Sequence, residues 1–125
     1  MRREKQVKVI RKGESPTVEG TTFTGHVSLE RAHTMEREGG MSVSIVHFDD
    51  GALTNWHVHP GEQVLVILDG KGRAGTEGES HELEPGDIAH SAPGERHWHG
   101  AAPGQSMTHA SITTVGAPEW FEAPE

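Results

Sequence analysis

The sequence of 125 residues contains no cysteine and no tyrosine, and aromatic side chains make up only 5% of it. The absence of cysteine excludes disulfides, thiolate nucleophiles and metal sites with cysteine ligands. Any metal ion must therefore be held by histidine, carboxylate or amide groups. A chain without cysteine also fits a reducing compartment, and we expect this protein in the cytoplasm.

Long apolar runs are also missing. No stretch approaches the roughly 18 apolar residues of a membrane span. A signal peptide would need a continuous apolar stretch after its charged start, but in the basic segment 1–12 Lys8 interrupts the few apolar residues. The formal net charge of -8 argues against binding to nucleic acid or to acidic membranes. We therefore expect neither nucleic acid nor a membrane as the partner.

The length fits one domain. Residues 1–12 carry six Lys or Arg and one Glu, which distinguishes them from the acidic remainder. We expect a basic arm or edge strand over 1–20, a β domain over 21–115 and a surface tail over 116–125. Trp120 and Phe121 of this tail are predicted to cover one end of the domain or a subunit partner.

Short segments rich in β-branched residues alternate with Gly, Pro and Asp turns, which is typical of an all-β sandwich or barrel. Helical periodicity is weak; its best candidate is 28–37, and we give a helix there little weight. The predicted strands are 41–48, 63–68, 73–76, 81–83, 88–91 and 107–115, with another beginning at Trp98.

Histidine is abundant, with ten residues, and two of them lie one residue apart in the sequence WHVHPGEQ. Alternate residues of a strand point to the same face, so His57 and His59 share a face, and Gln63 keeps that parity. Glu62 falls on the opposite face. Imidazole nitrogens and an amide oxygen together suit a borderline divalent metal ion, and they leave coordination positions for a substrate.

Two segments resemble the signature motifs of the cupins. In 51–70, Gly51, His57, His59 and Gly70 match the first motif, with Gln63 in the place of its acidic residue; in 86–97, Gly86, Pro93, Gly94 and His97 match the second. The resemblance implies a jelly-roll barrel, also called a double-stranded β-helix. It also implies that His57, His59, Gln63 and His97 hold a metal ion inside the barrel.

Three histidines and one glutamine form a neutral ligand shell, so a bound ion would keep its full double charge and act as a strong Lewis acid. The ligands do not select one metal. We expect Mn²⁺ first, while Fe²⁺, Ni²⁺ and Zn²⁺ accept the same groups.

The match over 22–121 is similar to the small single-domain cupins that include manganese-dependent hydroxynitrile lyases and carboxymuconolactone-decarboxylase-associated cupins. This resemblance implies that His109 acts as an acid or base near the metal, and that Thr54 and His99 also line the site. A hydrogen-bonded core histidine is the alternative reading for His109, and a second-shell or barrel-lining residue for His99. The resemblance implies a homodimer and a substrate pocket formed by Ser44, Val46, Phe48, Leu65 and Thr113.

Three functions fit these residues. The first is a metal-dependent lyase that acts on a small hydroxylated substrate, as hydroxynitrile lyases do. The second is a metal-dependent dioxygenase or related oxidoreductase, because open coordination positions can also hold oxygen. The third is a non-catalytic module that binds a small ligand. The strand 42–48 and residues Gly61 and Glu62 depart from the lyases, which affects the expected substrate more than the expected metal site.

Overall fold

The computed structural model describes residues 7–124, which form antiparallel strands and no helix. The prediction of an all-β jelly-roll barrel is confirmed. One sheet has six strands in the order β1-β3-β4-β12-β7-β10. Their bounds are Thr17–Glu19 (β1), Val27–His33 (β3), Met41–Phe48 (β4), Met107–Thr114 (β12), Gln63–Gly70 (β7) and Ile88–Ser91 (β10).

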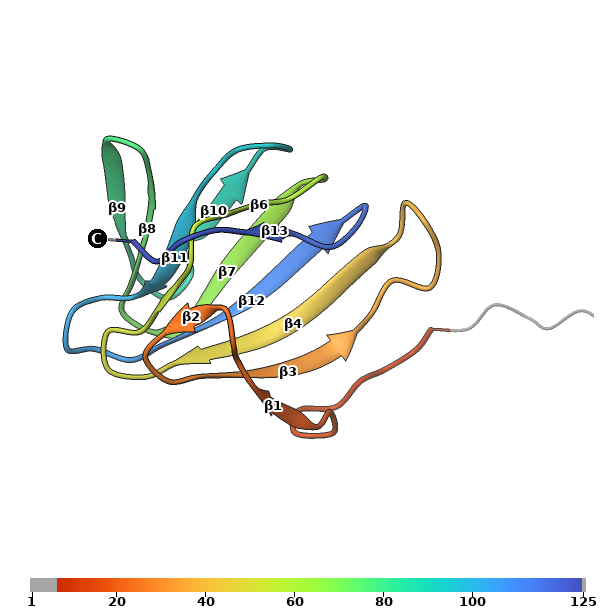
Figure 1. Ribbon diagram of the computed structural model, residues 1–125. Coiled ribbons are helices and arrows are strands. Elements are labelled where there is room, and N and C mark those ends of the chain that lie inside the picture. The colour runs from red at the N-terminus through yellow and green to blue at the C-terminus, as the bar shows by residue number, and fades with distance from the viewer. Residues whose placement is uncertain (1–6, 125) are drawn as a thin grey trace, which may run out of the picture.

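A second sheet has five strands in the order β2-β5-β11-β8-β9. Their bounds are Phe23–Thr24 (β2), Leu53–Thr54 (β5), Trp98–Ala101 (β11), Gly72–Thr76 (β8) and Glu79–Leu83 (β9). The short strands β6 (His57–Val58) and β13 (Glu119–Trp120) pair with each other. Figure 1 shows β3, β4, β12 and β7 running side by side, with β8, β9 and β11 beyond one end of this row.

Most predicted strands are present, but the weak helical pattern over 28–37 does not give a helix. Residues Val27–His33 instead form β3, which pairs with β4. In this strand Val27 and Leu29 turn towards the core, whereas Glu30 bonds to His47 of β4. The alternation of a strand therefore decides the structure of this segment, although its inward positions include polar residues.

The hydrophobic core lies between the two sheets. Its buried members come from both sheets and their loops: Val27, Val46, Phe48, Ala52, Ile67, Leu83, Ala101 and Met107. At one end of the core, Gly70 closes β7 with a φ of 77°. A Cβ atom there would lie 2.0 Å from the carbonyl oxygen of Ser106, so this position requires glycine.

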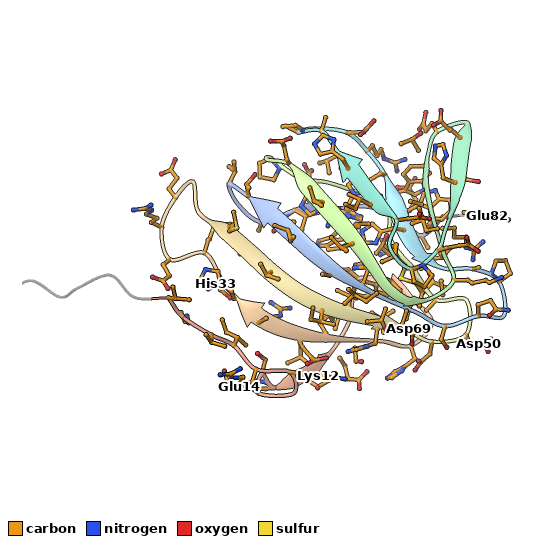
Figure 2. The ribbon with its side chains drawn as sticks, turned by 180° about the vertical axis from the view of Figure 1, so that it is seen from behind. Lys12, Glu14, His33, Asp50, Asp69 and Glu82 are labelled. Atoms are coloured by element: carbon orange, nitrogen blue, oxygen red, sulfur yellow. The ribbon has the colours of Figure 1, made fainter. Side chains whose placement is uncertain are left out.

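Charged side chains on the outside of the barrel include Lys12, Glu14, Asp50, Asp69 and Glu82, as Figure 2 shows. Residues 1–6 of the predicted basic arm lie outside the described residues, and the first strand of the described part is β1, at an edge of the six-stranded sheet. A search of residues 7–124 finds no helix that is long and apolar enough to cross a membrane.

Candidate metal centre

Three histidines from the two predicted motifs meet at one point of the barrel. His57 begins β6, His59 follows it, and His97 directly precedes β11. Backbone bonds join the motifs, because the N–H of His57 donates to the carbonyl of His97 (2.9 Å) and the reverse bond measures 3.0 Å. One possible ligand atom from each of the three side chains lies within 4.8 Å of the others, and all three residues are buried.

Two of these imidazoles are fixed in the orientation that metal binding requires. Nδ1 of His57 donates to the carbonyl of Asn55 at 2.8 Å, and Nδ1 of His97 donates to the carbonyl of Glu95 at 2.9 Å. Each Nε2 therefore keeps its lone pair, as in metal-bound histidines whose other nitrogen is anchored. Both ring nitrogens of His59 are buried and have no hydrogen-bond partner among residues 7–124.

Gln63 of β7 lies beside the three histidines. Its side-chain Nε2 donates to the Ser111 hydroxyl at 2.9 Å, and its Oε1 lies 2.8 Å from Nε2 of His97. Because Nδ1 of His97 already donates to a carbonyl, this close pair consists of two lone-pair atoms when the ring is neutral. A shared cation would stabilise such a pair. The donor set and the partnerless nitrogens of His59 thus fit a divalent metal ion.

The surroundings keep these imidazoles neutral. Burial, followed by the neighbouring His97, lowers the pKa of His57 to about 3 and that of His59 to about 4. Burial also lowers the pKa of His97. Neutral imidazole is the form that binds metal ions, so the site is ready for one at neutral pH.

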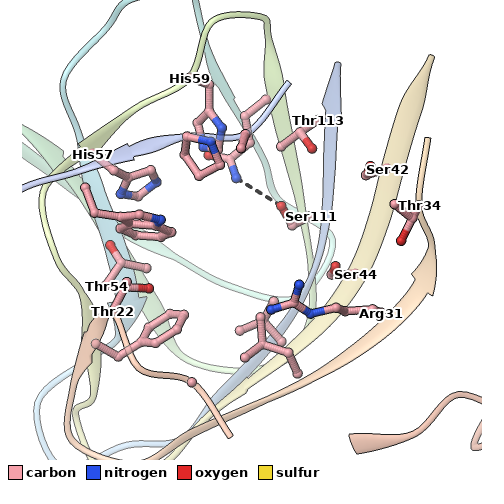
Figure 3. A pocket seen from close by; sticks show the side chains of 18 of the residues that line it. Thr22, Arg31, Thr34, Ser42, Ser44, Thr54, His57, His59, Ser111 and Thr113 are labelled. Carbon is pink, nitrogen blue, oxygen red and sulfur yellow. Dashed lines mark hydrogen bonds between the residues drawn. The ribbon is translucent and has the colours of Figure 1, made fainter. Parts of the chain in front are cut away.

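Three residues of the centre, His57, His59 and Gln63, form one wall of a cavity of about 490 Å³, a volume suited to a small molecule, whereas His97 lines a different cavity. Figure 3 shows His57 and His59 on one side and Ser44, Arg31 and Ser111 on the other. Of the predicted pocket residues, Ser44, Val46 and Thr113 line this cavity.

Two predicted pocket residues do not line this cavity. Phe48 is packed in the hydrophobic core, where its ring lies 5.8 Å from that of Phe23. Leu65 lines a second cavity of about 470 Å³, which also reaches His97 and His99. Strand parity directs both side chains inward, but Phe48 enters the core and Leu65 faces the second cavity.

The three predicted catalytic residues lie next to one another, but only two reach the main cavity. Thr54 and His99 line it, and the Thr54 hydroxyl accepts the backbone N–H of His99 at 3.0 Å. His109 lies behind them, fully buried, with Nε2 3.1 Å from Nδ1 of His99. Burial lowers the pKa of His109 to about 4 and that of His99 well below its usual value.

Several residues of the cavity were not assigned to the site from sequence, and Trp120 and Arg31 are two of them. Trp120 of β13 lies against His57, with ring centroids 4.5 Å apart. The predicted tail therefore contributes to the cavity wall that holds His57, His59 and Gln63, which we call the metal wall. Arg31 of β3 lines the opposite wall. The alternation Val27, Leu29, Arg31 could have indicated its inward direction if the segment had been interpreted as a strand. Glu62, predicted to face away from the ligands, is exposed and bonds to His90 at 2.7 Å.

Together, the barrel, the two joined motifs and the histidine centre define a class of protein. The family model described as "Cupin domain" matches residues 44–113, more than half of the chain, and the chain belongs to this family. The resemblance predicted from the two motifs is confirmed.

Individual relatives agree with this assignment. The chain is 42% identical over 91 residues to an (R)-mandelonitrile lyase of Granulicella tundricola, a match that covers 72% of this chain and 70% of that protein. A cupin-like protein of Thermotoga maritima is 36% identical over 84% of each chain, with a TM-score of 0.79. The polyketide cyclase RemF of Streptomyces resistomycificus shares the fold at 15% identity, with a TM-score of 0.76 over 96% of this chain and 89% of that one.

Proposed function

We propose that this protein is a metal-dependent lyase that cleaves a small hydroxylated substrate in the manner of a hydroxynitrile lyase. The observation that carries the proposal is the convergence of three buried histidines, His57, His59 and His97, beside Gln63, with His57, His59 and Gln63 lining a substrate-sized cavity. The 42% identity to a mandelonitrile lyase supports the reaction type. A divalent ion, with Mn²⁺ as our first choice, would supply Lewis acidity towards a substrate oxygen in this cavity.

The protein side chains have to move one proton. In cyanohydrin cleavage the hydroxyl loses its proton, the carbon-carbon bond breaks, cyanide leaves with the bonding electron pair, and an aldehyde remains. His99 suits the role of base because it lines the cavity and its lowered pKa keeps it neutral. When Nδ1 of His99 donates to His109, Nε2 of His99 is free to accept the substrate proton.

His109 then acts through His99 rather than on the substrate. A proton taken up at Nε2 of His99 can be balanced by transfer of the Nδ1 proton to Nε2 of His109, over the 3.1 Å contact between the rings. Thr54 is a positioning residue, since its hydroxyl accepts the backbone N–H of His99. Both residues support one base.

The test is release of benzaldehyde from mandelonitrile by protein loaded with Mn²⁺, compared with protein treated with a chelator. We expect turnover that depends on the metal, a large loss in His99→Ala, and a smaller loss in His109→Ala. His81→Ala, which changes an exposed histidine, is the control. Absence of metal-dependent turnover would remove the lyase assignment. Metal-dependent oxygen uptake on diketones, phenols or thiols would instead identify an oxidoreductase.

A further inference from the structure

One cationic side chain points into the cavity. On β3, Arg31 has the same parity as Val27 and Leu29, and it lines the cavity together with Leu29. Figure 3 shows its guanidinium group inside the cavity, on the side away from His57. The preceding residue, Glu30, bonds instead to His47. The alternation of the strand thus sends the positive charge inward and its neighbouring carboxylate to another partner.

The guanidinium of Arg31 has no carboxylate partner within residues 7–124, and it makes no hydrogen bond to another described residue. Arg73 and Arg96, by contrast, bond to a backbone carbonyl and to Glu122. Glu19 is the one carboxylate from the described part of the chain that lines the cavity, and it pairs with His26 at 2.8 Å. Arg31 is exposed at the cavity, and its five N–H donors are therefore available to a ligand that enters from solvent.

The hydroxyl residues Ser44 and Ser111 lie on the strands between Arg31 and the metal wall. Arg31 is paired with Ser44 on β4, and Ser44 with Ser111 on β12. Ser111 accepts the hydrogen bond from Gln63 on β7. Three strand spacings separate β3 from β7, or about 14 Å of sheet. A ligand that meets both Arg31 and the metal centre must therefore carry two polar groups, one at each end.

We propose that the cavity binds a small carboxylate, with its carboxylate on Arg31 and its hydroxyl or carbonyl oxygen facing the metal wall. This inference rests on the proposed function, because it names the substrate class of the same site. Arginine matches a carboxylate with two parallel N–H···O bonds, which a neutral pocket cannot offer. The predicted ligands His57, His59, His97 and Gln63 add no negative charge, so an ion held there and Arg31 would both attract an anion.

The test uses two alcohols of similar size as probes, para-hydroxymethylbenzoate and para-methylbenzyl alcohol. They share the benzylic hydroxyl and differ in the carboxylate. Binding to the full chain, with and without Mn²⁺, is measured by calorimetry. We expect the carboxylate to bind about tenfold tighter or more than the neutral alcohol, because charged hydrogen bonds carry this difference.

Three variants separate a specific contact from general charge. Arg31→Gln removes the charge and should abolish the preference for the carboxylate, while Arg31→Lys should keep part of it, since lysine attracts the anion without the fork of two donors. Arg37→Gln is the matched control. It removes the same charge from the exposed segment between β3 and β4, outside the cavity, and should leave the preference unchanged. Circular dichroism checks that each variant folds.

Equal affinity for the two alcohols, or a preference that survives Arg31→Gln, would overturn the inference. These outcomes can occur while mandelonitrile is still cleaved in a metal-dependent way, and the proposed lyase function would then stand without the carboxylate pocket. Conversely, an Arg31-dependent preference in a protein without metal-dependent turnover would support the carboxylate pocket and reject the lyase. The two failures are therefore distinguishable.

Discussion

The ten histidines of this chain include two contrasting groups. Exposed or half-buried histidines are paired with carboxylates: His26 with Asp49 and Glu19, His47 with Glu30, His81 with Glu79, and His90 with Glu62. The buried ones are His57, His59, His97, His99 and His109, and no carboxylate among the described residues pairs with them. A carboxylate partner therefore distinguishes the histidines at the surface from the buried histidines around the candidate metal centre.

The pKa of His26 and the pKa values of the buried histidines shift in opposite directions. A hydrogen bond to Asp49, followed by the charge of Glu19, raises the pKa of His26 above 6.5. Burial is the largest cause that lowers the pKa of each member of the buried group. Exposed pairs of this kind contribute little to stability because water screens them. The buried histidines lack such partners, and burying these polar rings costs free energy. Such a cost is typical of functional sites.

The largest expected effect is acid unfolding of the metal-free protein. Histidines with lowered pKa values bind fewer protons in the folded state than in the unfolded state, so stability is fully present above about pH 6.5 and falls as the pH decreases towards 3 to 4. Each pKa unit corresponds to about 1.4 kcal/mol, so His57 and His59 together account for several kcal/mol. Urea unfolding at a series of pH values measures this loss. A stability that stays constant from pH 7 to 4 would contradict it.

Removal of a predicted metal ligand should have the next largest effect. His59→Ala takes away an imidazole whose two nitrogens have no partner in the described chain, and we expect the affinity for Mn²⁺ to fall by at least about 100-fold. Competition with a metal chelator gives the affinity. His90→Ala, from the exposed group, should leave it unchanged. Equal losses in both variants would remove the distinction between the groups.

A smaller effect is expected from the residue that orients Gln63. Ser111→Ala removes the acceptor of the glutamine amide, which frees the side chain to turn away from His97. Partners of this kind typically contribute about tenfold or more to metal affinity. The same chelator competition measures the change. Ser111→Thr, which keeps a hydroxyl, is the control, and a full loss of binding in Ser111→Ala would show that Ser111 does more than orient the amide.

The smallest effect belongs to the exposed pairs. His81→Ala breaks the pair with Glu79, and we expect the free energy of unfolding at pH 7 to change by no more than about 0.5 kcal/mol. Urea unfolding measures it. A loss of several kcal/mol would mean that the exposed histidines are structural after all.

The sequence predicts most of the strands and the meeting of His57, His59 and His97 because both depend on local rules. Alternation places His57, His59 and Gln63 on one face, and the two motifs add His97. Strand parity gives only a direction, however, and does not say which space a side chain enters. The family resemblance implied that Phe48 and Leu65 line the substrate pocket, but Phe48 lies in the core and Leu65 lines a second cavity.

Long-range packing limits the prediction elsewhere. The inward positions of β3 include Arg31 and His33, so the segment lacks the apolar alternation that indicates a strand. Trp120 reaches His57 because β13 pairs with β6. Each of these strands has only two residues, which is too short to show an alternating pattern in the sequence. Likewise, the position of His109 behind His99 follows from how the two sheets meet.

The reciprocal backbone bonds between His57 and His97 have a consequence for the supply of metal. These bonds fix the two backbones at their mutual spacing, and the Nδ1 bonds to the carbonyls of Asn55 and Glu95 fix the two rings, without help from an ion. Exchange of one divalent ion for another then requires no rebuilding of the fold. On this basis, the ion found in the purified protein should reflect what the growth medium offers as much as what the barrel selects.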